Sequence, residues 1–284
     1  MSENLKVRIG DETICIEGDV QKDHWAIPPA YRPFIGPGKT AITLRLHKGI
    51  PETTLGEKVF DSPPIWTLYR HKGTSIIKIF DTFPGLKRAL VLTRHIGKAD
   101  LYCAEKSGRF CNPFYGPTME LLMVNYMAQA RAVIIHSCGI ARSGSGILFV
   151  GESGAGKSTL ARMWAEENGV DVLSDDRIIV RKKNHFFWMC GTPWHGDANF
   201  VSPRGARLER IFFLKRGQKN SVEQIKGADP VLHLLTCSFP PYWDPDGMAF
   251  TLDLFTDLAA QLPCQELAFR PDRSAVEFVN RVTA

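Results

Sequence analysis

The residues with the clearest capacity for chemistry lie at 147–159, which read Ile-Leu-Phe-Val-Gly-Glu-Ser-Gly-Ala-Gly-Lys-Ser-Thr. The pattern Gly-x-x-x-x-Gly-Lys-Ser within them is typical of a loop that binds phosphate groups. Apolar residues before the loop predict a short buried strand, and the residues after it predict a helix, which is the context that the pattern requires. A glycine-rich turn that contains Lys-Ser by chance is the alternative, and it does not explain this context. The sequence therefore predicts a nucleotide site.

The residue types in this loop suit a polyphosphate ligand. Gly151, Gly154 and Gly156 are expected to adopt positive φ and to let the backbone approach the ligand. The exposed N–H groups of the loop and the positive end of the following helix form a cradle. The Lys157 ammonium can reach the terminal phosphates, and the Ser158 hydroxyl can hold Mg²⁺. The expected nucleotide-binding residues are Gly151, Glu152, Ser153, Gly154, Ala155, Gly156, Lys157, Ser158 and Thr159.

Two neighbouring carboxylates, Asp175 and Asp176, follow a predicted strand at 170–174. Phosphoryl transfer needs a carboxylate near the metal and a base that orients the acceptor. Because adjacent residues of a strand point in opposite directions, one Asp could face Mg²⁺ and the other the acceptor hydroxyl. A loop pair in which one Asp caps the next turn is the alternative.

A histidine, His136, lies inside a predicted strand at 132–140. A lone histidine in an apolar strand is usually a core residue whose hydrogen bonds are satisfied. Here, however, the turn at 142–146 leads from that strand directly into the strand before the phosphate loop. This connection favours a place for His136 beside the loop.

Together, His136, the loop at 151–159 and Ser-Asp-Asp at 174–176 resemble the HPr kinase/phosphorylase family, which belongs to the P-loop group related in structure to phosphoenolpyruvate carboxykinase. The order is the same: a strand with His, a hairpin, the phosphate loop, a helix, and a strand that ends in Asp-Asp. The resemblance covers residues 130–182. It is specific there, because an ordinary phosphate-loop enzyme has neither this histidine nor an Asp-Asp pair so soon after the loop.

The resemblance implies an α/β fold, namely a phosphoenolpyruvate-carboxykinase-like P-loop domain with a mixed sheet, and the cofactors ATP and Mg²⁺. It implies Lys157 on the phosphates and Ser158, together with an Asp, on Mg²⁺. Asp175 would be the base that accepts the hydroxyl proton, with His136 close to it, and Asp176 would be linked to the metal.

Two departures separate the chain from HPr kinases themselves. Gly-Thr-Pro-Trp-His-Gly at 191–196 occupies the region in which those enzymes carry a glycine-rich signature for the reverse, phosphorylase reaction. The N-terminal part does not resemble their N-terminal domain either. The chain is more similar to the wider group of HPr-kinase-like proteins, which includes kinases that tailor ribosomally made peptides and kinases of free serine.

A compact turn at 191–197 and the arginines after it are further candidates for substrate contacts. His195 and Asp197 are polar groups in a Gly/Pro-rich loop, as expected of a segment that positions a substrate, although a purely structural turn explains them as well. Arg204 and Arg207 are candidates for a contact with the γ-phosphate or an acidic substrate, against the alternative of a solvated surface.

These residues predict a kinase that uses ATP and Mg²⁺ to phosphorylate a hydroxyl group on a protein, a peptide or a small molecule. A serine hydroxyl is the favoured acceptor. One alternative is a carboxykinase-like phosphotransferase that acts on a small metabolite, although the additional metal-binding Lys and His residues of such an enzyme are not evident. Another is a non-catalytic nucleotide-binding regulator that signals through its β-rich part. No residue can be assigned to adenine recognition from the sequence.

The chain is expected to form two domains, a β-rich one at 1–115 and the P-loop domain at 116–284, with a helix at 118–131 between the two parts. In the first, apolar alternation predicts a small antiparallel meander or open barrel, with strands at 40–46, 65–69, 74–80 and 89–92. Beyond the Asp pair, strands are expected at 178–181, 186–190, 211–214 and 266–269, and helices at 228–237, 247–261 and 274–282.

The composition excludes several classes of protein. With a net charge of +5 and 44% hydrophobic residues, the 284 residues suit a globular chain, without a basic run typical of nucleic-acid binding or an apolar run that could span a membrane. No signal peptide is evident, so a cytoplasmic location is expected, and a homo-oligomer is the default for the group. Seven scattered cysteines without a C-x-x-C pair predict reduced thiols rather than disulfides or a zinc site.

Overall fold

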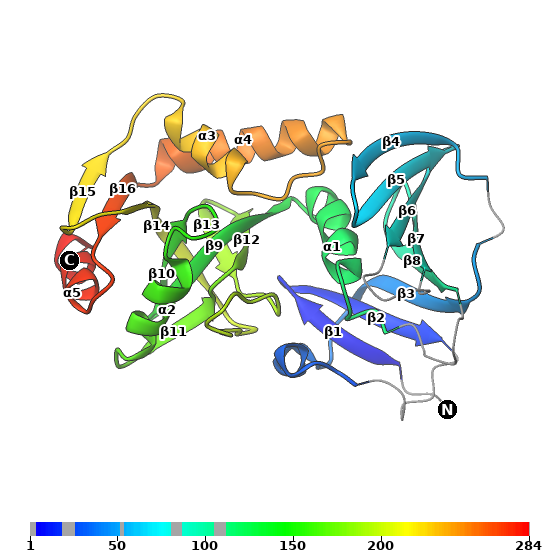
Figure 1. The fold of residues 1–284 in the computed structure, drawn as a ribbon, viewed down its shortest axis with the longest axis horizontal. Coiled ribbons are helices and arrows are strands. Elements are labelled where there is room, and N and C mark those ends of the chain that lie inside the picture. The colour runs from blue at the N-terminus through cyan, green and yellow to red at the C-terminus, as the bar shows by residue number, and fades with distance from the viewer. Residues whose placement is uncertain (1–3, 19–25, 52–53, 81–86, 105–111, 284) are drawn as a thin grey trace. The chain divides into compact units, whose positions relative to one another are not determined.

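The computed structural model describes residues 4–18, 26–51, 54–80, 87–104 and 112–283 (Figure 1). The chain divides into two compact units, Met1–Gln129 and Ala130–Ala284. The boundary therefore lies later than the one expected at 115. The reason is helix α1 (Thr118–Gln129), which belongs to the first unit.

Side-chain contacts fix α1 in that unit. Gln129 accepts a hydrogen bond from the Ile96 N–H and donates one to the Arg94 carbonyl. Tyr126 donates to the Glu12 carboxylate. These partners lie far from α1 in the sequence, so no local pattern could indicate which unit the helix joins.

The first unit is built on a sheet of eight strands, which are β1 (Leu5–Ile9), β2 (Glu12–Gly18), β3 (Thr40–Lys48), β4 (Glu57–Ser62), β5 (Trp66–His71), β6 (Thr74–Phe80), β7 (Lys87–Thr93) and β8 (Lys98–Cys103). A short 3₁₀ helix, η2 (Pro29–Phe34), lies between β2 and β3. β4 to β8 form the expected antiparallel meander. In contrast to that expectation, β3 pairs in parallel with both β2 and β8.

One cysteine differs from the expectation of reduced thiols. Cys103, at the end of β8, is disulfide-bonded, and Cys111 lies outside the described residues. The remaining cysteines are free and buried, and they are Cys15, Cys138, Cys190, Cys237 and Cys264. The expectation is therefore wrong for Cys103, because spacing along the chain does not show which cysteines the folded backbone brings within bonding distance.

The second unit is a mixed α/β fold around another eight-stranded sheet. Its strands are β9 (Ala132–Arg142), β10 (Ser145–Val150), β11 (Val170–Ser174), β12 (Arg177–Lys183), β13 (Phe186–Cys190), β14 (Gly205–Arg216), β15 (Ser221–Gln224) and β16 (Cys264–Phe269). Its helices are α2 (Lys157–Ala165), α3 (Asp229–Thr236), α4 (Pro245–Gln261) and α5 (Ser274–Thr283). β10 and β16 run parallel to β14 and the other pairs are antiparallel, so the predicted mixed sheet is confirmed.

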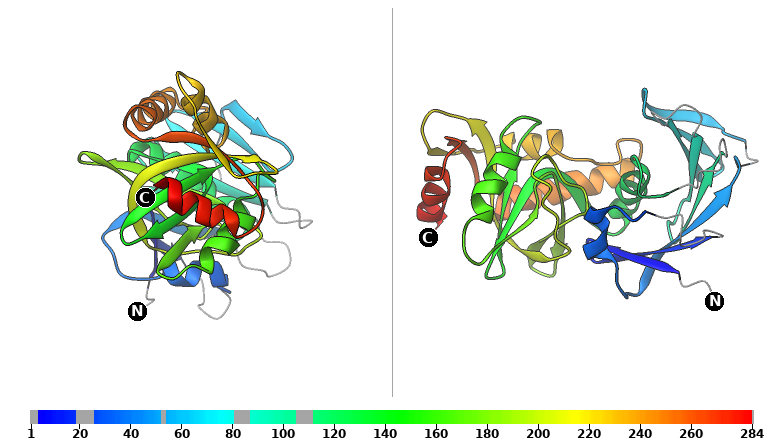
Figure 2. Two further views of the ribbon diagram at one scale, coloured as in Figure 1. Left: turned by 90° about the vertical axis from the view of Figure 1, so that its left-hand side faces the viewer. Right: turned by 60° about the horizontal axis from the view of Figure 1, so that its bottom comes forward.

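Helices cover both faces of this sheet. The left view of Figure 2 shows α3 and α4 along one side and α5 along the other. Side-chain alternation in β10 explains the arrangement, because Leu148 and Val150 pack in a core with Leu254 of α4, whereas Phe149 packs in a second core with Trp164 of α2. No helix of the described residues is long and apolar enough to cross a membrane.

Strand β9 brings separate parts of the site together. One edge of β9 pairs with β10. Along the other edge, residues 132–136 pair with β12 and residues 139–142 pair with β11. Asp175 and Asp176 connect β11 to β12, so they lie beside the stretch of β9 that begins at His136.

The carboxyl ends of three strands meet at one edge of the sheet. β10, β14 and β16 are parallel neighbours, and they end at Val150, Arg216 and Phe269. In open α/β sheets, ligands bind outside the carboxyl ends of the parallel strands. The phosphate loop, which follows Val150, lies at this edge.

Candidate functional site

The glycines of the phosphate loop serve two different purposes. Gly154 and Gly156 have φ of +81° and +104°, as expected, because glycine adopts this region without steric cost. The φ of Gly151 is not positive, so the expectation is wrong there. A Cβ at Gly151 would lie 2.8 Å from the Ala155 Cβ, so this glycine permits close packing inside the loop.

The Lys157 ammonium lies inside the loop and is 6% exposed. Its Nζ donates hydrogen bonds to the carbonyl oxygens of Gly151 at 2.7 Å and Glu152 at 3.0 Å. Burial lowers the pKa of this ammonium, and the nearby Asp176 carboxylate opposes the shift. A phosphate group is a stronger acceptor than a neutral carbonyl, so a bound polyphosphate can compete for these N–H donors.

Asp175 follows β11 and is 1% exposed. Its Oδ2 accepts a hydrogen bond of 2.7 Å from the Ser158 hydroxyl. Backbone N–H groups of Gly196 and Ala198 donate to the same carboxylate at 3.0 Å, and that of Phe200 donates at 3.3 Å. Asp175 therefore joins the start of α2 to the loop that follows β13.

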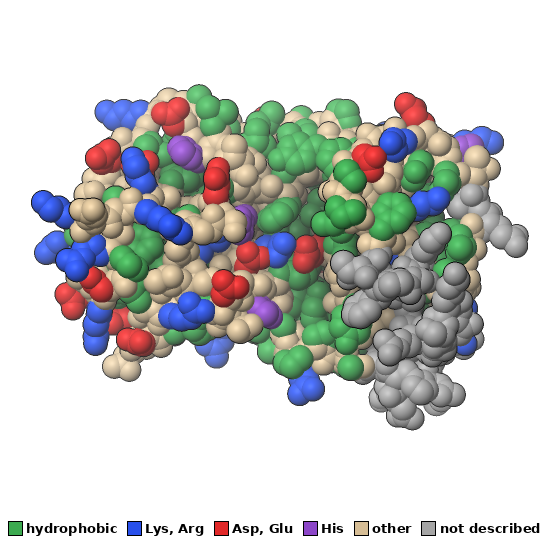
Figure 3. Space-filling model, in the orientation of Figure 1, with side chains coloured by type: hydrophobic (Ala, Val, Ile, Leu, Met, Phe, Trp, Pro, Cys, Tyr) green, Lys and Arg blue, Asp and Glu red, His purple; other side chains and the backbone are tan. Residues whose placement is uncertain are grey.

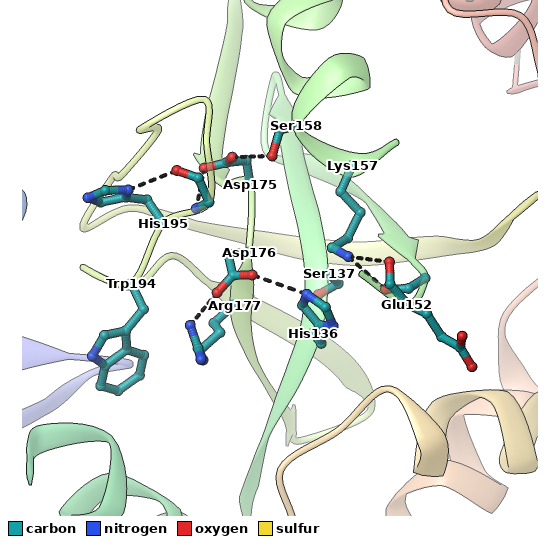
Figure 4. Close-up of polar contacts among 12 residues, drawn as sticks. His136, Ser137, Glu152, Lys157, Ser158, Asp175, Asp176, Arg177, Trp194 and His195 are labelled. Carbon is teal, nitrogen blue, oxygen red and sulfur yellow. Dashed lines mark hydrogen bonds and ion pairs between the residues drawn. The ribbon is translucent and has the colours of Figure 1, made fainter. Parts of the chain in front are cut away.

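Asp176 points away from Ser158, toward β9 (Figure 4). Its Oδ1 lies 3.1 Å from His136 Nε2, and its other oxygen forms an ion pair with Arg177. The Arg177 guanidinium also lies over the Phe239 ring, 4.9 Å from the centroid. The Asp176 side chain is 18% exposed, so it is accessible while its partners hold it in place.

The structure pairs the aspartates in the reverse of the expected way. The expectation has His136 beside Asp175 and links Asp176 to the metal residue Ser158, whereas the structure joins His136 to Asp176 and Ser158 to Asp175. The register of β12 on β9 is the reason, because Arg177 pairs with His136 and the preceding Asp176 reaches that histidine.

The pKa of Asp176 is lowered from its usual range. Burial favours the neutral carboxyl group, but the hydrogen bond from His136 and the positive charge of Arg177 outweigh it, with a smaller contribution from Lys157. The carboxylate is therefore ionised at neutral pH and able to accept a hydrogen bond from an incoming hydroxyl group.

One cavity of about 610 Å³ connects these groups. Its wall includes loop residues 153–159, His136, both aspartates and Asp197. Arg204 lies outside this wall, 78% exposed beside Asp171, and Arg207 lies beside Glu209. His195 is exposed, and its Nδ1 lies 2.9 Å from the Gly196 carbonyl oxygen. Of the four expected substrate contacts, the structure therefore brings Asp197 to the cavity and leaves the others outside.

The cavity wall also contains residues that the sequence analysis did not select. Arg162 of α2 donates to the Asp197 carbonyl at 2.8 Å. Arg216, at the end of β14, donates to the Gly154 carbonyl at 2.9 and 2.6 Å. A helical projection could have indicated Arg162, because it lies one turn after Ser158. No local signal could have indicated Arg216, because its strand is distant from the loop in the sequence.

The pair formed by Ser158 and Asp175 fits a magnesium ion. Hydroxyl and carboxylate oxygens are ligands that Mg²⁺ prefers, usually one or two of them together with phosphate oxygens and water. A Cβ at Gly196 would lie 2.8 Å from Asp175 Oδ2 and 2.9 Å from Ser158 Oγ, so this glycine keeps the space beside both oxygens open. Within the described ranges, no group of three or more His, Cys, Asp or Glu side chains is arranged to hold a metal.

The surface of the second unit carries charges of both signs. Figure 3 shows Lys and Arg side chains interspersed with Asp and Glu over its visible face, in the region that β10, α2 and α5 occupy in Figure 1. This face therefore has no large area of a single charge.

Comparison with known proteins identifies the loop. A family model described as an AAA domain matches residues 147–189. The structure of the Hpr(Ser) kinase/phosphatase from Coxiella burnetii is similar with 13% sequence identity and a TM-score of 0.31, over 53% of this chain and 93% of that chain. No curated protein matches the chain. The family match and the geometry of the loop together show that the chain contains a P-loop nucleotide-binding domain.

Proposed function

We propose that this chain is a kinase that transfers the γ-phosphoryl group of ATP, in the presence of Mg²⁺, to a hydroxyl group. One observation carries the proposal: the buried Lys157, the Ser158–Asp175 pair and the His136–Asp176 pair face the same cavity. Phosphoryl transfer requires a phosphate cradle, a metal and a group that orients the acceptor. Each of the three arrangements is suited to one of these tasks.

We assign the phosphates to the loop and the metal to the Ser158–Asp175 pair. The loop N–H groups and Lys157 bind the β- and γ-phosphates. Ser158 and Asp175 supply oxygen ligands for Mg²⁺, which neutralises charge on the phosphates when it is bound. Asp175 is poorly suited to act as the base, because it is buried and accepts hydrogen bonds from Ser158 and from the loop backbone.

Asp176 is the proposed base. It is ionised at neutral pH, lines the cavity and can accept the proton of an acceptor hydroxyl. Its lowered pKa makes it a weak base, but the transition state of phosphoryl transfer is loose, so orientation of the hydroxyl matters more than basicity. His136 and Arg177 are positioning residues that hold this carboxylate.

The proposed acceptor is a serine hydroxyl on a protein, a peptide or a small molecule. The support for this choice is the resemblance of residues 136–176 to kinases that act on such acceptors. The proposal includes no nucleic-acid or membrane partner.

Incubation with γ-labelled ATP and Mg²⁺ tests the proposal, with free serine, serine-containing peptides and serine-containing proteins as separate acceptors. A kinase should transfer label to at least one class of acceptor and release little phosphate without an acceptor. Lys157→Ala should abolish the transfer. A protein that binds ATP, transfers label to none of these acceptors and instead changes its affinity for a partner with nucleotide state would be a regulator, and the kinase proposal would be wrong.

A further inference from the structure

The cavity continues past the phosphate loop, away from the aspartates. Its far wall contains Arg216, Gly217, Phe269 and Pro271. These residues end or follow β14 and β16, which run parallel to β10. Because the phosphate loop follows β10, the neighbouring strand ends lie where the remainder of a nucleotide would extend.

Arg216 is exposed at this wall, and its orientation is fixed. Two of the five N–H donors of its guanidinium bond the Gly154 carbonyl oxygen, at 2.9 and 2.6 Å. A guanidinium plane held in one orientation loses little freedom when a ligand packs on it. Nucleobases stack on arginine guanidinium planes in many complexes.

Phe269 supports this wall from below the loop. It pairs in register with Arg216 across β14 and β16, so both side chains lie on the same face of the sheet. The ring is 4% exposed, and an added Cβ at Gly156 would lie 2.7 Å from its Cζ atom. The loop glycines and the wall are therefore packed together.

We propose that this end of the cavity binds the nucleoside of the nucleotide, with the base packed against the Arg216 guanidinium and beside Pro271. The inference rests on the proposed function only in that the ligand is a nucleoside triphosphate. It assigns the nucleoside contacts to residues that follow β14 and β16 rather than to the loop itself.

A second hollow, of about 430 Å³, lies on the other side of the loop and is the rival location. Its wall includes Thr236, the carboxylate residues Glu152 and Glu266, and the cations Lys215 and Arg216, so Arg216 borders both spaces. Neither Ser158 nor either aspartate of the 175–176 pair lines this hollow, whereas all three line the first cavity together with Arg216. The first cavity therefore connects the proposed metal and acceptor residues to Arg216, which the second hollow does not.

Titration calorimetry with two ligands, Mg-ATP and magnesium tripolyphosphate, tests the inference, because tripolyphosphate carries the phosphates without a nucleoside. Arg216→Ala should weaken Mg-ATP binding by about tenfold and change tripolyphosphate binding by less than about threefold, as expected for the loss of one stacking contact. Lys215→Ala is the matched control, because it removes the same charge from the adjacent, exposed position, where Lys215 pairs with Glu266. It should change neither affinity.

Four outcomes would overturn the inference. Equal weakening of both ligands by Arg216→Ala would mean that Arg216 acts only through the loop. A wild-type protein that binds both ligands equally well would have no nucleoside site, although its phosphate loop and the proposed kinase activity would stand. Selective loss of Mg-ATP binding in Thr236→Trp, which fills the second hollow, would place the nucleoside there. A wild-type protein that binds neither ligand would contradict the proposed function as well.

Discussion

The Ser158 hydroxyl donates a hydrogen bond of 2.7 Å to Asp175, and the same carboxylate holds the backbone of the loop at 196–200. Asp175, one of the two residues proposed as metal ligands, therefore also anchors a loop that borders the cavity. Occupation of the pair by a cation and the position of this loop are linked through one side chain.

Asp176→Asn should separate chemistry from binding. The amide keeps the shape of the side chain but cannot accept a proton, so we expect transfer to fall by about 10²–10⁴-fold while nucleotide affinity changes only a few fold. Transfer rates and calorimetry on the same preparation measure both. Asp257→Asn, at an exposed carboxylate paired with Lys182, is the control and should leave both unchanged. An equal loss of affinity and rate in Asp176→Asn would contradict the role proposed for Asp176.

Asp175→Ala should destabilise the second unit. The backbone N–H groups of Gly196 and Ala198 would lose their acceptor, and an unsatisfied buried donor costs about 1–3 kcal/mol. We expect the free energy of unfolding to fall by about 2 kcal/mol or more, measured by urea denaturation. Asp176→Ala, whose side chain is more exposed, should lose less. A variant of Asp175 as stable as the wild type would show that the anchor is not needed.

Gly196→Ala should obstruct the metal site. The added methyl group would lie within 3 Å of both oxygens, so either the loop moves or the cation is excluded. Mg²⁺-dependent nucleotide binding, measured with and without the cation, should weaken by at least about tenfold. Gly97→Ala is the control, because a Cβ there meets no atom within 4 Å. Unchanged dependence on Mg²⁺ in Gly196→Ala would place the cation elsewhere.

His136→Ala should shift the pH dependence of transfer. In the wild type, the lowered pKa of Asp176 keeps the carboxylate ionised until the pH falls below its usual value of 3.8. Without His136 a lowering influence is lost and the burial that raises the pKa remains, so the acid limb of kcat should move to higher pH. His195→Ala, at an exposed position outside the cavity wall, should leave the profile unchanged. A shift toward lower pH, or none, in His136→Ala would exclude the proposed coupling.

Arg162→Ala should impair transfer, whereas Arg204→Ala should not. Arg162 lines the cavity beside the phosphate loop, and loss of a cation there should lower kcat/KM by at least about tenfold. Arg204 is 78% exposed beside Asp171. Steady-state kinetics of the two variants measure both effects. A loss of kcat/KM in Arg204→Ala and none in Arg162→Ala would favour Arg204 as the contact, as the sequence analysis suggested.

Local patterns of the sequence predict the elements around the loop well. The strands expected at 170–174 and 186–190 have the bounds of β11 and β13, because each is a short apolar run closed by turn residues. β14 extends well beyond the expected 211–214, because charged residues such as Arg207 and Glu209 interrupt its apolar run. β16, which contains the strand expected at 266–269, is not the last strand of the sheet, because β15 pairs with it and the polar residues of β15 give no strand signal.

The candidate site was predictable only where its parts are close in the sequence. The loop and the Asp pair are local features. The partner of Asp176 depends on the register of β12 on β9, which pairs Arg177 with His136 and cannot be recognised in either segment alone. The approach of Arg216 to Gly154 depends in the same way on the parallel pairing of β14 with β10.

The groups assigned to phosphoryl transfer all belong to one stretch of the chain, 136–177, whereas the wall at the other end of the cavity belongs to 216–271. The two ends therefore come from separate segments that meet at the loop, where Arg216 bonds Gly154 and Phe269 packs against Gly156. Relatives of this protein could inherit the same reaction chemistry and diverge in the nucleotide that they consume.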